Sequence, residues 1–385
     1  MRARPRLSAI ALSLIGLCAF ANVAQAASET PKIDAAVQEA ATKVMQEYAI
    51  PGMAIALSVE GKQRFYTFGV ASKATDQKVT ADTLFEVGSV SKLFTATLAT
   101  YAQLKGQLSL SDNIAKYLPE LQGTPLGKIA LMHLATHTAG GFPLQVPDSV
   151  QNERQLMDYF KAWQPAYDAG SQRSYANPSI GLLGMITAKS LNMPYAQALE
   201  QQLFPALGMT NSYINVPADK MALYAQGYNK QEAPVRLNPG LLSYVFGLKS
   251  SARDLIHFTE LNMGLGSVSE PLSRAMADTR IGYFKVGPMT QDLIWEQYPY
   301  PAKLETLIAG NSNTMAYENN KAIALTPPLA PQQAAWINKT GSTNGFGAYV
   351  AFVPEKKQAV VILANKNYPN QARVELAYAL FNAVN

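Results

Sequence analysis

The sequence predicts an α/β fold of the α+β type, in which an antiparallel β-sheet is flanked by helices and interrupted by an inserted all-helical lobe. Both ends of the chain contain segments in which apolar and polar residues alternate on either side of a short polar turn, whereas the middle has helical periodicity. Alternation with a period of two is typical of paired strands, and apolar spacing of three and four is typical of helices. We therefore expect the two ends to share one sheet.

Residues 1–26 have the features of a secretory signal. Three arginines precede an apolar run from Leu7 to about Ala21, and Ala24-Gln25-Ala26 supplies small residues at the cleavage positions. This run is shorter than the roughly 20 residues of a membrane-spanning helix, and no later run is longer. We expect residues 1–26 to be removed during export and the remaining chain to have no membrane anchor.

The composition of the remaining chain excludes several function classes. Cys18 is the single cysteine and lies in the predicted signal, which excludes disulfides, a cysteine nucleophile and thiolate-bound metals in the processed chain. The net charge of +5 includes the three signal arginines, so processing leaves 5 − 3 = +2. Basic residues are scattered without aromatic neighbours, and we therefore expect no nucleic-acid partner.

The strands and helices are assigned in chain order. Ile50 to Ser72 predicts a hairpin around Glu60-Gly61, and GAYVAFVP and QAVVILAN near the C-terminus predict a second hairpin around 355–357. A helix is predicted from about Ala372 to Ala383. These patterns divide the chain into an α/β lobe at 27–105 and 225–385 and a helical lobe at 106–224. A cleft between lobes is a common place for a small-molecule site.

The segment SVSKLFTATLATYAQLKG predicts a helix that begins near Ser89 and ends at Gly106. Ser89 and Lys92 then lie three residues apart on one helical face, where the ammonium group can steer the hydroxyl proton and favour the developing alkoxide. Backbone N–H groups at the helix start can help to hold an oxyanion. A serine and a lysine at this spacing also occur by chance, as a helix start with a surface lysine.

The tetrapeptide Lys339-Thr340-Gly341-Ser342 precedes GAYVAFVP, which is predicted to be an edge strand. An edge offers unpaired backbone groups for a substrate amide, and the Ser342 N–H is a candidate second oxyanion donor. Taken alone, the same residues are equally compatible with an ordinary glycine-containing turn into a strand.

Three tyrosines match the pattern tyrosine-any-asparagine, at Tyr175, Tyr213 and Tyr317. Asn177 is followed by Pro178 and an apolar segment, which predicts an N-cap with proline at the first helical position. Tyr175 would then lie just before a helix start, with Lys92 and Lys339 near enough to lower its pKa. The other two are interpreted as ordinary loop tyrosines.

Together, FEVGSVSK, RSYANPS and NKTGSTNGFG resemble the class C serine β-lactamases, or cephalosporinases, and the similarity extends over essentially the whole processed chain. The segments IPGMAIAL, THTAGGFPLQVPD and LANKNYPNQAR are also similar to that family. The resemblance implies hydrolysis of the β-lactam ring of cephalosporins and penicillins through a serine acyl-enzyme, and hence antibiotic resistance. It also implies a periplasmic monomer that needs no cofactor or metal.

The resemblance further implies roles for individual residues. Ser89 would be the nucleophile, Lys92 and Tyr175 would share the proton transfers, and Lys339 would steer the substrate carboxylate. The residues expected to bind substrate are Gln145, Asn177, Phe246, Thr340, Gly341, Ser342, Asn370 and Arg373. Phe246 stands where class C enzymes usually have a tyrosine, and we interpret it as an aromatic wall, although Tyr244 could take that place instead.

Other serine-enzyme and metal assignments find less support. Ser111-Asp112-Asn113 matches a class A tripeptide but follows Ser89 too closely, and is interpreted as a helix cap. His133 and His137 have a spacing that can bind zinc, but no Glu follows His133 and no third ligand is evident, so we expect a packed helix or turn. A DD-peptidase or esterase with the same fold, and a non-catalytic penicillin sensor, are the alternatives to a β-lactamase.

Overall fold

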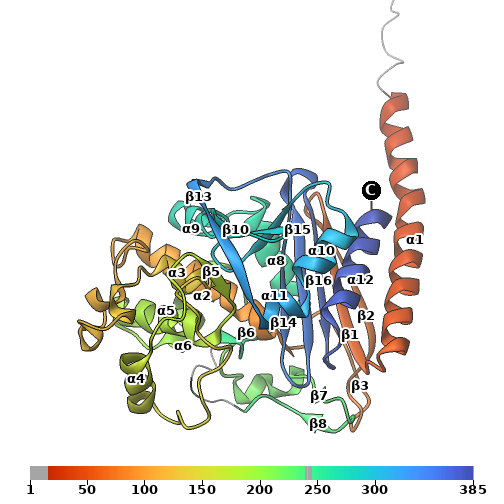
Figure 1. The fold of residues 1–385 in the computed structure, drawn as a ribbon. Coiled ribbons are helices and arrows are strands. Elements are labelled where there is room, and N and C mark those ends of the chain that lie inside the picture. Colours follow the sequence, from red (N-terminus) through yellow and green to blue (C-terminus); the bar gives the residue numbers. More distant parts are fainter. Residues whose placement is uncertain (1–15, 239–240, 242–244, 385) are drawn as a thin grey trace, which may run out of the picture.

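The computed structural model describes residues 16–238, 241 and 245–384. Its main feature is an eleven-stranded sheet in the order β3-β2-β1-β16-β15-β14-β12-β11-β10-β13-β5, and the paired strands are antiparallel (Figure 1). The strands are β1 Gly52–Val59, β2 Lys62–Ser72, β3 Gln77–Lys78, β5 Gln172–Ser174, β10 Gly282–Val286, β11 Met289–Gln291, β12 Glu296–Pro299, β13 Asn319–Leu329, β14 Ala335–Ser342, β15 Gly347–Val353 and β16 Gln358–Ala364.

Two smaller sheets complete the strands. One has the order β4-β9-β6 and the other pairs β7 with β8. Their bounds are β4 Phe85–Glu86, β6 Ser212–Tyr213, β7 Gly227–Tyr228, β8 Pro234–Val235 and β9 Lys249–Ser250.

The α-helices are α1 Gly16–Glu47, α2 Ser91–Leu104, α3 Met132–Ala135, α4 Glu153–Ala162, α5 Asn177–Ser190, α6 Tyr195–Gln197, α7 Phe204–Ala206, α8 Ala252–Asn262, α9 Glu270–Asp278, α10 Leu304–Gly310, α11 Asn313–Tyr317 and α12 Asn370–Ala383. A 3₁₀ turn, η1 Gly88–Val90, leads directly into α2. The predicted mixture of antiparallel sheet and helices is confirmed.

The central strands separate two hydrophobic cores because their side chains alternate. On β16, Val361 and Leu363 face the core beneath α2 and α8, whereas Val360 and Ile362 face the core beneath α1 and α12. Both faces are apolar, so these strands consist of nearly continuous apolar residues. Helices therefore cover both faces of the sheet (Figure 1).

The structure confirms both predicted hairpins. β1 and β2 pair up to Val59 and Lys62 around the Glu60-Gly61 turn, and β15 and β16 pair up to Val353 and Gln358. The prediction that GAYVAFVP is an edge strand is wrong, because β15 lies between β14 and β16. An apolar run that is buried on both faces marks an interior strand.

The division into lobes stays a prediction, and one strand complicates it. β5 lies within 106–224 but pairs with β13, at one end of the large sheet. The predicted cleavage position at Ala26 lies within α1, whose N-terminal part stands clear of the other elements (Figure 1). In the described part of the chain, no helix is long and apolar enough to cross a membrane.

Candidate active site

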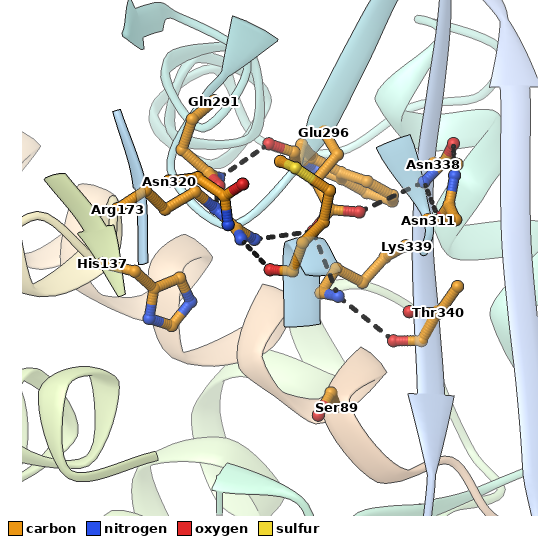
Figure 2. A network of polar contacts seen from close by, with 12 residues as sticks. Ser89, His137, Arg173, Gln291, Glu296, Asn311, Asn320, Asn338, Lys339 and Thr340 are labelled. Atoms are coloured by element: carbon orange, nitrogen blue, oxygen red, sulfur yellow. Dashed lines mark hydrogen bonds and ion pairs between the residues drawn. The ribbon is translucent and has the colours of Figure 1, made fainter. Parts of the chain in front are cut away.

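A pocket that is partly open to solvent lies where η1, β14, β12 and the start of α5 meet α10 and α11. Ser89 lies below Lys339 and Thr340, which come from β14 (Figure 2). The pocket is lined by Ser89, Leu144, Gln145, Arg173, Tyr175, Asn177, Glu296, Gly310, Asn311, Ser312, Met315, Ala316, Tyr317, Lys339, Thr340, Gly341, Ser342 and Asn370. It therefore contains parts of all three sequence motifs.

Ser89 and Lys92 are in direct contact. Ser89 belongs to η1 and Lys92 to the first turn of α2, and the Lys92 Nζ donates to Ser89 Oγ at 2.7 Å. The Lys92 side chain is fully buried, and burial lowers the pKa of its ammonium group; nearby Lys339 lowers it further, while Tyr175 opposes this shift. Lys92 is thus suited to exchange a proton with the serine.

The backbone of β14 presses directly against the turn that carries Ser89. A Cβ added at Gly88, where φ is +53°, would lie 2.3 Å from the Ser342 backbone nitrogen. A Cβ at Gly341 would lie 2.0 Å from the Val87 carbonyl oxygen and 3.1 Å from the Ser89 backbone nitrogen. Both positions therefore require glycine, and the close approach brings the Ser89 and Ser342 backbones together.

The tetrapeptide 339–342 lies within β14 rather than before its strand. β12 pairs with β14 only as far as Asn338, whereas β15 pairs with it through Ser342. Residues 339–342 therefore have a strand on one side and the pocket on the other. The expected sheet edge is present, but only locally.

Lys339 faces a buried carboxylate. Its Nζ lies 3.6 Å from Glu296 Oε1, and both side chains are nearly inaccessible. The same oxygen accepts from Arg173 Nη2 at 3.1 Å, while Arg173 Nε donates to Gln291 at 2.6 Å (Figure 2). A buried carboxylate that faces two cations offsets their charge, and its contacts hold both side chains in place.

Tyr175 is half-buried among these charges, and its ring centroid lies 5.2 Å from both Lys92 Nζ and Lys339 Nζ. Burial acts to raise the pKa of the Tyr175 hydroxyl, but Lys339, Lys92 and the neighbouring Ser89 outweigh burial and lower the pKa to about 8. The Tyr175 Oη has no hydrogen-bond partner within the protein. The hydroxyl is therefore acidic and available to a ligand.

Asn177 differs from the prediction in one respect. α5 begins at Asn177 itself, with Ala176 at the N-cap position and no side-chain cap. The Asn177 Oδ1 is buried without a hydrogen-bond partner and its residue lines the pocket, as does Gln145. The side chain is consequently free for a substrate contact instead of closing the helix end.

The beta-lactamase family model matches residues 37–385. The chain belongs to the β-lactamase family. It is 50% identical over 367 residues to a β-lactamase of Lysobacter lactamgenus, with 94% of this chain and 95% of the relative covered.

Solved structures place the chain among the class C β-lactamases. It is 62% identical, with a TM-score of 0.90, to a structure described as β-lactamase/D-alanine carboxypeptidase from Pseudomonas syringae, covering 91% of this chain and 98% of that one. A class C β-lactamase in complex with cefoxitin has 48% identity and a TM-score of 0.90, covering 92% and 99%.

Arg373 lies behind the pocket of this β-lactamase rather than in it. The side chain is fully buried, and Nη1 donates to the Gly341 carbonyl at 2.6 Å and to Ser342 Oγ at 3.0 Å. Asn370, one turn earlier on α12, does line the pocket. Arg373 thus fixes the end of β14 in place.

Phe246 is the predicted site residue that the structure separates from the others. It is half-buried in a turn, packs against the larger hydrophobic core and is not among the pocket-lining residues. The alternative, Tyr244, lies outside the described residues, so the aromatic wall stays a prediction.

The motifs that the sequence analysis set aside lie at Asn113, Tyr213 and His133. Asn113 occupies the N-cap position of the 3₁₀ helix Ile114–Lys116, but its side chain makes no capping bond. Tyr213 is not a loop tyrosine as predicted, because it is the last residue of β6; its Oη donates to the Thr210 carbonyl at 2.9 Å, and it is not among the pocket-lining residues. His133 lies in α3, as the prediction of a packed helix or turn requires.

Sequence reasoning missed Glu296, Asn311 and Met315 in the lining of the pocket. None of them belongs to a recognisable short motif, and Glu296 acquires its importance only because β12 pairs with β14. Arg173 stands in RSYANPS, two residues before Tyr175, and this spacing along an extended segment could have placed both side chains on one face. The interpretation of Tyr317 as a loop tyrosine is wrong, because it is the last residue of α11 and lies at the pocket rim, 70% exposed.

Proposed function

We propose that this class C β-lactamase hydrolyses the β-lactam ring in two steps, with Ser89 as the nucleophile. The Ser89 Oγ attacks the lactam carbonyl carbon, the ring C–N bond breaks, and the serine proton passes through Lys92 and Tyr175 to the ring nitrogen. Water then attacks the resulting ester and gives its proton to Tyr175, which releases Ser89 and the opened product. The observation that carries this proposal is the 2.7 Å contact between Lys92 Nζ and Ser89 Oγ.

The backbone N–H groups of Ser89 and Ser342 would form the oxyanion hole. Support comes from the close approach of Gly88 and Gly341 to the opposite backbone, since preorganised donors stabilise the tetrahedral intermediate most strongly. The substrate carboxylate would face Lys339 and Thr340, near Asn370. Gln145 and Asn177 would bind the side-chain amide, with the unpartnered Asn177 Oδ1 as acceptor.

The test is Ser89→Ala in the processed chain, assayed with a chromogenic cephalosporin. Turnover should fall by about a thousandfold or more because the acyl-enzyme route is closed. Wild-type hydrolysis should be insensitive to a chelator, and mass spectrometry should detect a penicillin adduct on wild type alone. The same adduct on the alanine variant, or full inhibition by the chelator, would refute the mechanism.

A D-alanine carboxypeptidase activity is the second candidate, because two similar structures are described with that activity, from Pseudomonas syringae and Burkholderia cenocepacia. Both reactions begin with acylation of the serine, and the rate of deacylation separates them. Release of D-alanine from a peptide ending in D-alanyl-D-alanine, measured beside cephalosporin turnover, distinguishes a carboxypeptidase from a β-lactamase.

We also propose export to the periplasm with cleavage after Ala26, a monomeric processed enzyme, and the lobes at 27–105 with 225–385 and at 106–224. The arginines and apolar run of residues 1–26 support export. Edman sequencing of the exported protein should begin at Ala27, and light scattering should give the monomer mass.

A further inference from the structure

His137 lies directly beside Tyr175 but has no part in the mechanism above. It follows α3 in the turn that leads into THTAGGFPLQ, and its side chain is buried, on the side of the polar network away from Asn338 and Thr340 (Figure 2). Its φ is +58°, in the left-handed region that side chains other than glycine seldom adopt. Residues held in this conformation against their preference cluster at functional sites.

His137 contacts the Tyr175 segment at three points. Its carbonyl oxygen accepts from the Ser174 N–H at 2.8 Å, and its ring Nδ1 accepts from the Ala176 N–H at 3.3 Å. The imidazole also packs against the Tyr175 ring, with centroids 4.5 Å apart and planes inclined by 48°. One residue therefore holds the residues before and after Tyr175 as well as its ring.

The contact with Ala176 fixes the protonation of the imidazole. Because Nδ1 accepts a hydrogen bond, the neutral ring carries its proton on Nε2. The pKa of His137 is lowered well below its usual range, first by burial and then by Arg173, Lys92 and Lys339. His137 is therefore neutral at neutral pH and adds no further positive charge beside Tyr175.

We propose that His137 is a positioning residue, which holds Tyr175 in the place where its hydroxyl lies between Lys92 and Lys339. The proposal rests on the function proposed above, in which Tyr175 moves the proton. The left-handed backbone at His137 points its carbonyl and its Nδ1 at the peptide groups on opposite sides of Tyr175. Substitutions that remove the ring contact and the Nδ1 acceptor leave Tyr175 free to move away from the two ammonium groups.

The charged groups that face Tyr175 come from three elements. Lys92 approaches from α2, Lys339 from β14 and Arg173, whose guanidinium lies 5.3 Å from the ring centroid, from β5. Glu296 on β12 lies behind Lys339 and Arg173. Since two of the cations lower the pKa of Tyr175, displacement of its hydroxyl raises that pKa toward 10.

The variants separate the ring from the hydrogen bond. His137→Gly removes both and suits the left-handed backbone, so it should fold. His137→Asn tolerates the same backbone and keeps a short side-chain acceptor for the Ala176 N–H, whereas His137→Phe keeps the ring and loses the acceptor. His133→Asn is the matched control, because His133 lies four residues earlier and bonds Thr138 instead.

The decisive measurement is the pKa of Tyr175, read from tyrosinate ultraviolet absorbance as the difference between each protein and the same protein with Tyr175→Phe. We expect this pKa to rise by about one unit in His137→Gly and His137→Phe, to rise less in His137→Asn, and to be unchanged in His133→Asn. An unchanged Tyr175 pKa in a folded His137→Gly, or equal shifts in the Asn and Phe variants, overturns the proposal.

Turnover gives the second readout. kcat should fall about tenfold or more in His137→Gly with KM changed less, and the acidic limb of the kcat–pH profile should move to higher pH. If wild type does not hydrolyse β-lactams, the proposed function fails, but the absorbance titration still decides whether His137 positions Tyr175. If KM changes by as large a factor as kcat and the acidic limb of the kcat–pH profile does not move, His137 contributes only to folding.

Discussion

Two walls of the pocket are built on different physical principles. The backbone wall, formed by η1 and residues 339–342 of β14, depends on close contact between main chains, which only glycine at 88 and 341 permits. The charged wall, formed by Tyr175, Lys92, Lys339, Arg173 and Glu296, depends on buried charges that balance one another. In the proposed mechanism, the first wall fixes where the reacting carbonyl lies, and the second sets which groups hold protons.

The charged wall should show the larger effect when its central hydroxyl is removed. Tyr175→Phe keeps the ring and its packing but removes the hydroxyl whose pKa is lowered to about 8, so kcat should fall by about a thousandfold. In wild type, kcat should increase as pH rises through about 8, because the ionised form accepts the proton. Stopped-flow acylation and steady-state pH profiles measure both effects.

Tyr213→Phe is the matched control, since burial and the carboxylates of Asp254, Asp219 and Glu200 raise the pKa of Tyr213. We expect little change in turnover for this variant, and likewise for Tyr317→Phe at the pocket rim. If kcat falls as far in Tyr213→Phe or Tyr317→Phe as in Tyr175→Phe, the assignment of the proton transfer to Tyr175 is wrong.

The backbone wall is broken by a single methyl group. In Gly88→Ala the new Cβ would lie 2.3 Å from the Ser342 nitrogen, so the two main chains must separate and kcat should fall about a hundredfold. Gly61→Ala has a similar positive φ of +79° but no atom within 4 Å. Turnover and thermal unfolding of the two variants separate the clash with Ser342 from the strain of a positive φ. Equal losses in the two variants would show that the close approach of the main chains is unimportant.

The balance of charge is tested by Glu296→Gln. The variant leaves Lys339 and Arg173 without their shared carboxylate, which should destabilise the fold by about 3–5 kcal/mol. The unbalanced cations should also lower the pKa of Tyr175 further, so the acidic limb of the kcat–pH profile moves to lower pH, opposite to the shift expected for His137→Gly. Glu305→Gln, on the exposed side of α10, is the control in chemical denaturation and in the pH profile.

The smallest effect is expected at Phe246, which belongs to neither wall. Phe246→Tyr should leave cephalosporin turnover within about threefold, because the two side chains differ by one oxygen. Phe246→Ala should raise KM more for substrates with bulky aromatic side chains than for small ones if the residue is an aromatic wall. Unfolding, or an equal loss for every substrate, would instead assign Phe246 to the core against which it packs.

The two walls also differ in how far the sequence predicts them. Ser89, Lys92 and residues 339–342 could be found because helix spacing and glycine requirements are local properties of short segments. Tyr175 could be separated from Tyr213 and Tyr317 by the helix start after it, although the expected side-chain cap at Asn177 does not form. Glu296 and His137 could not be assigned to the site, because their roles arise from the pairing of β12 with β14 and from a left-handed turn.

The same contrast holds for the fold. Hairpins with turns of two and four residues could be predicted, since each strand lies next to its partner in sequence. The position of β15 inside the sheet and the pairing of β5 with β13 could not, because these neighbours are distant along the chain and their alternation is compatible with several strand orders.

The short unpaired edge at 339–342 has a consequence for self-association. Exposed strand edges invite pairing with another copy of the chain, and proteins usually guard them with charge or cover. The unpaired edge ends at Asn338, where β12 begins to pair with β14. The edge lines a pocket bordered by α10 and α11. Such a recess offers little length for a foreign strand to pair with, so the unpaired edge can persist without becoming a template for aggregation.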